Sequence, residues 1–148
     1  MKQIIIITDG NSNEGVSPVA AAAQAYAKGI VVNVIGVVDR EREGMRGERE
    51  IEAMAKAGGG IHRIVIPSQL AYTMQMMTRH TVAATIQHVV NQELRAILKD
   101  DQATLAALPP DKRAQVVRSV DEWTETSPLR VALLIDASAS MRNKFNDV

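Results

Sequence analysis

Cysteine is absent from this sequence, and aromatic residues make up only 3% of it. The lack of cysteine excludes disulfide bonds, thiolate metal sites and thiol catalysis, and it fits a reducing compartment. The scarcity of aromatic side chains leaves no stacking platform of the kind that binds single-stranded nucleic acid.

Neither sign of charge is in excess, because 17 lysines and arginines balance 17 aspartates and glutamates. No overall field therefore draws the protein toward nucleic acid or anionic lipid. Long apolar runs are also lacking: MKQIIIITDG at the start holds four consecutive isoleucines, whereas a membrane span needs about twenty apolar residues and a secretory signal needs a longer apolar region. We therefore expect a cytoplasmic protein that binds neither nucleic acid nor membranes.

The residues that are present have the composition of one globular domain. Of the 148 residues, 46% are hydrophobic and 23% charged, which is enough to bury a core. Apolar β-branched runs predict strands, and the stretches between them have helical spacing. The strands are expected at 4–7, 30–38, 61–66 and 130–135. Alternating strands and helices predict an α/β fold, with a doubly wound, Rossmann-like, mostly parallel sheet and flanking helices.

The sequence also predicts a loop, a turn and helices in the remaining segments. The charged stretch 39–49 predicts a solvated loop, followed by a short helix over about 48–57 that ends at the triple glycine 58–60, interpreted as a turn. Apolar residues at helical spacing over 68–98 predict one long helix or two, and another helix should follow Pro109-Pro110 as far as about Trp123.

Oxygen-bearing side chains follow two of the predicted strands. Asp9 comes directly after IIIIT, and Asp136, Ser138 and Ser140 come directly after VALLI. Loops at the carboxyl ends of parallel strands gather at one edge of a sheet, where ligands bind in doubly wound folds. Two carboxylates and two hydroxyls suit a hard cation such as Mg²⁺, Mn²⁺ or Ca²⁺ and are unsuited to zinc.

These stretches resemble a known family. VALLIDASASM is similar to the DxSxS strand and loop of von Willebrand factor type A (VWA) domains, and IIIITDG resembles the strand whose aspartate completes their metal-ion-dependent adhesion site (MIDAS). AYAKGIVVNVIGV and EREIEAMAKAGGGIHRIVIPSQL resemble the second half of such a domain. The resemblance covers about residues 2–78 and 129–143, and it implies that Asp136, Ser138, Ser140 and Asp9 surround one divalent ion.

The sequence departs from the family in two ways. The DxSxS piece follows the TDG piece instead of preceding it, and no segment matches the threonine that the family supplies from a loop between them. A circular permutation explains the order, with 1–78 as the C-terminal half of a VWA-like fold, 79–128 as a helical bridge and 129–148 as the first strand with its DxSxS loop. The same order is associated with short VWA proteins of spore-forming bacteria that continue further, so we expect this fold to be incomplete, with a truncation at the C-terminus.

The resemblance implies a binding module and not an enzyme. An open position on the ion would accept an exposed aspartate or glutamate of a protein partner. Because part of the sheet would be uncovered, we also predict that the protein is less stable than a full domain or forms a homodimer through the exposed sheet edge.

Three other interpretations remain open. An enzyme would use Ser138 or Ser140 as nucleophile, or Asp9 as the centre of a phosphatase, but the GxSxG signature is absent. A scaffold protein would work through the helical region 68–123, with a vestigial metal site. In the least specific interpretation, Asp136 and Ser138 only cap a helix that begins near Ser140.

Overall fold

The computed structural model describes residues 1–12, 14–38, 45–99 and 104–146, and these fall into two compact units. One unit comprises residues 2–81 and 130–148, and the other comprises Met1 and residues 82–129. Helix α3 (Leu70–Leu98) is continuous, so the long helical segment is one helix and not two. Among the described residues, no helix has the length and hydropathy needed to span a bilayer.

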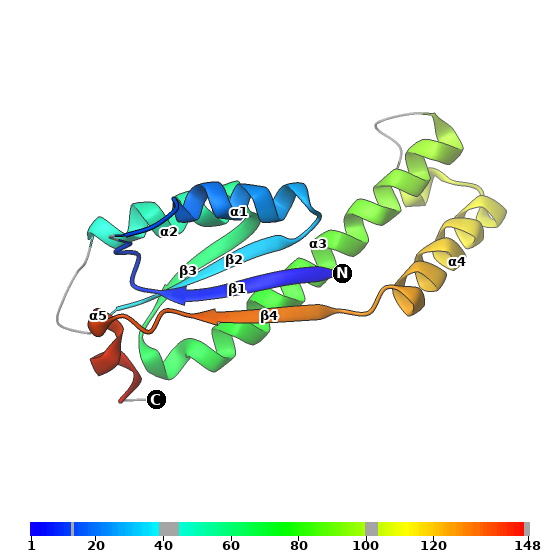
Figure 1. Ribbon diagram of the computed structural model, residues 1–148. Helices are drawn as coiled ribbons and strands as arrows, with labels where there is room; N and C mark the ends of the chain where they lie inside the picture. Colours follow the sequence, from blue (N-terminus) through cyan, green and yellow to red (C-terminus); the bar gives the residue numbers. More distant parts are fainter. Residues whose placement is uncertain (13, 39–44, 100–103, 147–148) are drawn as a thin grey trace. The chain divides into compact units, whose positions relative to one another are not determined.

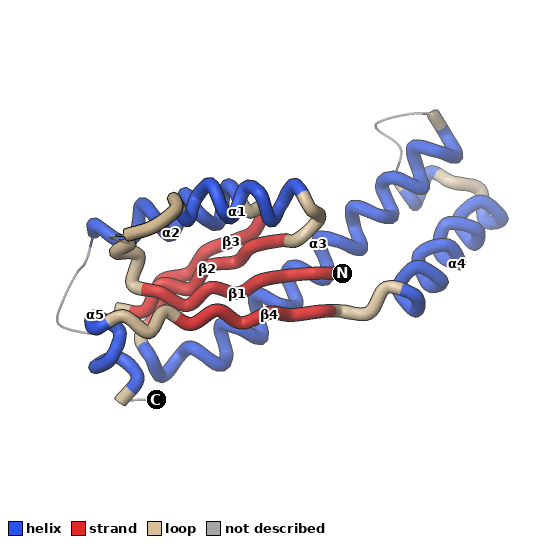
Figure 2. Tube along the Cα trace, viewed as in Figure 1, coloured by secondary structure: helices blue, strands red, loops and turns tan. Residues whose placement is uncertain are grey.

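The first unit is built on a parallel sheet of four strands in the order β3-β2-β1-β4 (Figures 1 and 2). Their bounds are β1 Lys2–Thr8, β2 Val31–Val37, β3 Gly59–Val65 and β4 Arg130–Ile135. Helices flank this sheet, which confirms the predicted α/β, Rossmann-like class. The apolar runs at β1 and β2 are explained by burial on both faces of the sheet.

Two hydrophobic clusters cover the two faces of the sheet. Alternate residues Ile5 and Ile7 of β1 pack with Leu70 and Met77 of α3. The intervening residues Ile4 and Ile6 face the other cluster, which contains side chains of α1 (Pro18–Ala27) and α2 (Met45–Ala57). Helix α1 begins at Pro18, where the Ser17 hydroxyl accepts a hydrogen bond from the Ala20 N–H and Pro18 opens the first turn.

A buried polar network attaches α3 to the sheet. Asn33 of β2 is fully buried, and its amide donates to the Gln3 carbonyl oxygen and the Thr81 hydroxyl. Gln3 in turn donates to the Thr78 hydroxyl at 2.9 Å. The Asn33 carbonyl oxygen accepts from the Ile61 N–H at 3.0 Å. Each buried polar group is thereby paired within the protein.

The same asparagine explains an irregularity in β3. The register pairs Val32 with Gly59 but Val34 with His62, so β3 carries one extra residue opposite Asn33. Such a bulge frees a backbone N–H from the ladder. Here the freed group is the Ile61 N–H, which donates to the Asn33 side-chain oxygen. At Gly60 an added Cβ would lie 2.1 Å from the Val32 carbonyl oxygen, so the close approach of the strands requires glycine there.

Two local expectations are corrected. The triple glycine is not only a turn, because Gly59 and Gly60 open β3. Residues 45–49 are expected in a solvated loop, but they belong to α2. This helix begins at Met45 and not at about residue 48. The remaining residues of that expected loop, 39–44, lie outside the described part of the sequence.

The second unit has a small core of its own. Leu94 near the end of α3, Leu108 and Val116 of α4 (Pro110–Thr126) are buried against one another. A short 3-10 turn, Leu105–Ala107, precedes α4. As predicted, a helix follows Pro109, although it extends past Trp123 to Thr126.

Candidate metal centre

The ends of β1 and β4 lie side by side, as the sequence predicted for these two distant stretches. Ile4 pairs with Ala132 and Ile7 with Ile135, in parallel. One step beyond, the Asp136 N–H donates to the Ile7 carbonyl oxygen at 2.9 Å. The two loops that follow these strands therefore leave the sheet from adjacent positions.

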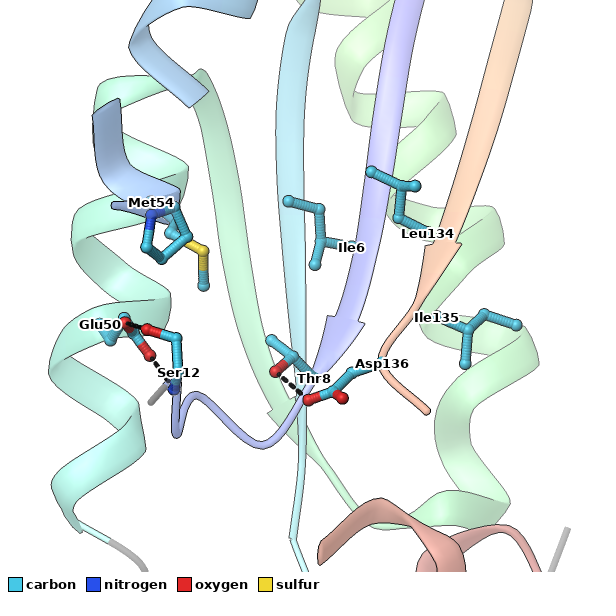
Figure 3. Close-up of a pocket in the computed structure, with 9 residues that line it drawn as sticks. Ile6, Thr8, Ser12, Glu50, Met54, Leu134, Ile135 and Asp136 are labelled. Carbon is cyan, nitrogen blue, oxygen red and sulfur yellow. Dashed lines mark hydrogen bonds between the residues drawn. The ribbon is translucent and has the colours of Figure 1, made fainter. Parts of the chain in front are cut away.

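The last side chain of β1 and the first side chain after β4 are in direct contact. The Thr8 hydroxyl donates to the Asp136 carboxylate at 2.9 Å (Figure 3). It also accepts the Gly10 N–H at 3.1 Å. Asp136 also accepts the Ser138 N–H at 2.8 Å, just as Asp9 accepts the Asn11 N–H at 3.3 Å. This bond to the residue two positions on is the local preference of aspartate, and it curls each loop at the end of its strand.

Asp9 occupies the buried part of the centre. Its side chain is only 4% exposed and lies 3.2 Å from the Lys144 ammonium. Burial by itself would raise the pKa of the Asp9 carboxyl, but hydrogen bonds from Ser140, Lys144 and the Asn11 N–H, with the charge of Lys144, hold that pKa below its ordinary value. Asp9 is therefore an anion at neutral pH.

The two serines complete the centre. The Ser138 and Ser140 hydroxyl oxygens are 3.0 Å apart, and Ser140 is near enough to Asp9 to lower the pKa of its carboxyl. Ser138 stands at the N-cap of the short helix α5 (Ala139–Arg142), but its hydroxyl makes no capping bond. Hydrogen bonds thus link Asp136, Ser138 and Ser140, and Asp9 lies near Ser140. The capping interpretation does not account for the Ser138 hydroxyl.

The loop after β1 is fixed against α2 at two points. Ser12 donates from its N–H to the Glu50 carboxylate at 3.1 Å, and its hydroxyl bonds to the other Glu50 oxygen. Gly10 has φ +76°, and a Cβ there would lie 2.2 Å from the Gly47 carbonyl oxygen. Backbone therefore packs on backbone between Gly10 and Gly47, which is how the start of α2 holds Asp9 in place.

The substitution Gly47→Ala tests this packing. A Cβ at Gly47 would lie 1.9 Å from the Asp9 carbonyl oxygen, so we expect a loss of about 1–3 kcal/mol in the free energy of unfolding. Without such a clash the same change inside a helix would instead stabilise by about 0.5–1 kcal/mol. Thermal unfolding, monitored by circular dichroism, shows whether the substitution lowers or raises the free energy of unfolding. The control is Glu52→Ala, at an exposed position of the same helix.

A pocket of about 240 Å³ opens beside the centre (Figure 3). Ser12 and Glu50 lie at one side of it, and Thr8 and Asp136 lie between them and the side chains of Leu134 and Ile135. Its walls are mainly apolar, formed by Ile6, Pro18, Met54, Leu134 and Ile135. The hydrogen-bonded set therefore lies next to apolar surface that a second molecule could cover.

The donor set fits a hard cation. Every candidate ligand atom is oxygen, and the set combines two carboxylates with neutral hydroxyls. Among the residues that the structure describes, no three His, Cys, Asp or Glu side chains cluster as metal ligands. An ion held here would depend on Asp9 and Asp136 together with hydroxyl groups.

Sequence reasoning missed two residues at this centre. Thr8 directly follows the predicted strand 4–7, and its hydroxyl could have been noted as a donor close to the neighbouring strand end. Lys144 lies 135 positions from its partner Asp9, and no local pattern marks it.

Comparison with known proteins gives relatives but no family assignment, because no protein-family model matches the sequence. The chain is 45% identical over its whole length to the uncharacterized protein YabS of Bacillus subtilis. A crystal structure of an uncharacterized protein from Alicyclobacillus acidocaldarius superposes with a TM-score of 0.80 at 46% identity over 97% of the chain. The chain spans 60% of the first relative and 61% of the second.

A third similarity is more distant. An aerotolerance-related membrane protein from Bacteroides fragilis, crystallised with multiple mutations to serines, aligns over 53% of this chain and 47% of its own, with 30% identity and a TM-score of 0.40. The strong match to the Alicyclobacillus structure supports the fold described above.

Proposed function

We propose that this protein is a cation-dependent binding module whose ion is held by Asp9, Asp136, Ser138 and Ser140 and receives an acidic side chain of a protein partner. The observation that carries the proposal is that these four residues gather at the ends of two adjacent parallel strands, where hydrogen bonds link Asp136, Ser138 and Ser140 and where Asp9 lies near Ser140. Thr8 positions Asp136 within that set.

The charges of the site explain why it would recruit an anion. Two aspartates at most balance a divalent ion, and serine hydroxyls add no negative charge. An ion bound there keeps its attraction for a further carboxylate, and Mg²⁺ commonly retains exchangeable waters in protein sites. A partner's aspartate or glutamate could displace one of these waters.

The resemblance to VWA domains supports the same proposal. Its two motifs stand in reversed order along the sequence, yet β4 and β1 are neighbours in the sheet. The adjacency needed for a MIDAS-like centre is therefore compatible with a permuted order. The oxygen-only donor set agrees with the Mg²⁺, Mn²⁺ or Ca²⁺ that the resemblance implies.

The open position can be tested with a matched pair of small molecules. Mn²⁺ bound to the protein should enhance the relaxation rate of water protons, and propionate, which mimics a glutamate side chain, should reduce that enhancement by displacing a bound water. Propionamide, which has the same shape without the charge, should leave it unchanged. No enhancement would refute ion binding, and equal effects of the two molecules would refute carboxylate recognition.

Lys144 is expected to compete with the ion for Asp9. Its ammonium contacts the carboxylate that the ion would use, so Lys144→Met should raise the affinity for Mg²⁺ by about tenfold, equivalent to about 1.4 kcal/mol. Isothermal titration with MgCl₂ measures this change. The exposed Lys112 of α4 gives the control Lys112→Met, and equal affinities of the two variants would contradict the competition.

A further inference from the structure

A second pocket, of about 250 Å³, lies between the edge strand β3 and helix α3. All the side chains that line it come from residues 61–80, one continuous stretch of the first unit. None of the residues of the candidate metal centre lines this pocket. Its volume is slightly below the range of about 300–1,000 Å³ typical of small-molecule sites, so it suits a small ligand.

The walls of this pocket are mostly apolar. Met77 of α3 is a buried core residue, and Ile61 of β3 packs against the same core cluster. Tyr72 and Met76 are 68% and 45% exposed, and their spacing of four residues places them on one face of α3. Large apolar side chains that stay exposed around a hollow are typical of binding surfaces. The pocket therefore offers an apolar ligand body contacts with both the strand and the helix.

A charged side chain interrupts the apolar wall on β3. Ile61, Arg63 and Val65 alternate along the strand, and the first and last of them face the hydrophobic cluster beneath α3. Arg63 therefore lies on the same side of the sheet, where it lines the pocket. Its guanidinium donates to the His62 carbonyl oxygen at 2.9 Å, and it pairs with no carboxylate among the described residues. Its remaining N–H groups are available to a carboxylate, which the planar guanidinium binds with two parallel hydrogen bonds.

A buried hydroxyl in the pocket also has no partner. Thr73 is only 9% exposed, yet its hydroxyl bonds to no group in the described part of the chain. Helical threonines commonly bond to the carbonyl four residues earlier, as Thr124 and Thr126 do in α4. Every side-chain oxygen or nitrogen sealed from solvent among the described residues has a partner, so the free Thr73 oxygen is accessible. Since Thr73 lines the pocket, this hydroxyl is available to a polar group of a ligand.

We propose that the pocket between β3 and α3 binds a small organic carboxylate that carries an aromatic or aliphatic body. The carboxylate is held by Arg63, with Thr73 as a further hydrogen-bond partner. The body lies against Met76, Met77 and the ring of Tyr72. The single unpaired cation and the apolar walls favour this ligand over a multiply charged anion. The proposal does not depend on the cation site at the ends of β1 and β4.

Methionine methyl groups give a direct readout of this pocket. Met76 and Met77 line it, whereas Met54 belongs to the hydrophobic cluster on the other face of the sheet. The probe is hydrocinnamate, a phenyl ring on a short carboxylate chain, added in EDTA so that no divalent cation takes part. In NMR spectra of protein with isotope-labelled methionine methyl groups, hydrocinnamate should shift the Met76 and Met77 signals and leave Met54 unchanged. We expect a Kd of about 1 mM or lower for a ligand of this size.

Two matched comparisons test the role of the charge. Hydrocinnamamide has the same shape without the charge, and it should bind at least about tenfold more weakly, since hydrogen bonds to ionised groups are roughly twice as strong as neutral ones. Arg63→Gln should lower the affinity for hydrocinnamate by the same factor and leave the affinity for the amide within about twofold. The control is Arg118→Gln, which removes an exposed cation from α4 and should change neither affinity.

The hydroxyl is tested separately with Thr73→Val, which keeps the shape of the side chain and should weaken hydrocinnamate binding by roughly threefold or more. Circular dichroism of all variants checks that the fold is retained. A charge on an edge strand can also serve only to deter pairing with other chains, and in that case hydrocinnamate would shift neither Met76 nor Met77. That result, or equal affinities for the acid and the amide, would overturn the proposal.

Discussion

Replacing Asp136 with asparagine is expected to lower the affinity for Mg²⁺ or Mn²⁺ by at least about 100-fold, equivalent to about 2.7 kcal/mol. The amide keeps the size of the carboxylate, and its oxygen can still accept the Ser138 N–H that Asp136 now binds. Its nitrogen can donate to Thr8, whose hydroxyl bonds to Asp136 in the parent. The change therefore removes one of two negative charges from the centre while preserving the local hydrogen bonds.

Isothermal titration or the signal of free Mn²⁺ in electron paramagnetic resonance measures this loss. The control is Asp121→Asn, which removes an exposed carboxylate from α4 and should leave the affinity within about twofold of the parent. If Asp136→Asn bound Mn²⁺ as well as the control did, Asp136 would not be a ligand and the proposed centre would fail. Circular dichroism of both variants checks that the fold is retained.

Asn33→Ala is expected to cause the largest loss of stability. The substitution removes hydrogen bonds from the Gln3 carbonyl oxygen and the Ile61 N–H in a fully buried position. Leaving a buried polar group without its partner costs about 1–3 kcal/mol, so two such groups give about 2–6 kcal/mol. For a protein of this length the melting temperature should fall by roughly 10 °C.

The matched control is Asn91→Ala, because Asn91 is exposed on α3 and accepts one hydrogen bond, from Gln87. Its effect should stay within about 0.5 kcal/mol. Thermal and urea unfolding, monitored by circular dichroism, compare the two. Similar small effects in both variants would show that the buried network contributes little to the stability of the sheet.

The fold class could be read from the sequence because hydrophobic patterning is local information. The run IIIIT has no polar alternation, which indicates a strand covered on both faces, and β1 is covered in this way by two hydrophobic clusters. The convergence of Asp9 and Asp136 on one edge also followed, since parallel strands present their carboxyl ends together. Predicting where these two aspartates lie required only the strand directions and not the details of side-chain packing.

Other features depend on contacts between distant residues and could not be predicted. Gly47 resembles a helix breaker in a charged stretch, yet it lies within α2. Glycine is required at this position because the loop at Gly10 approaches too closely for any side chain. Gly60 similarly reads as part of a turn, although its place in β3 is set by the Val32 backbone across the sheet. In both cases the partner that requires glycine lies far along the sequence.

The Gln3 and Asn33 network also restricts how α3 can lie on the sheet. Its two acceptors on α3, Thr78 and Thr81, are three residues apart and meet two amides on neighbouring strands. If the helix slid along its axis by one turn, these amides would face other side chains and lose their bonds, although the apolar contacts could re-form. The network therefore favours one position of the helix on the sheet. Apolar contacts alone are not directional and would not provide this specificity.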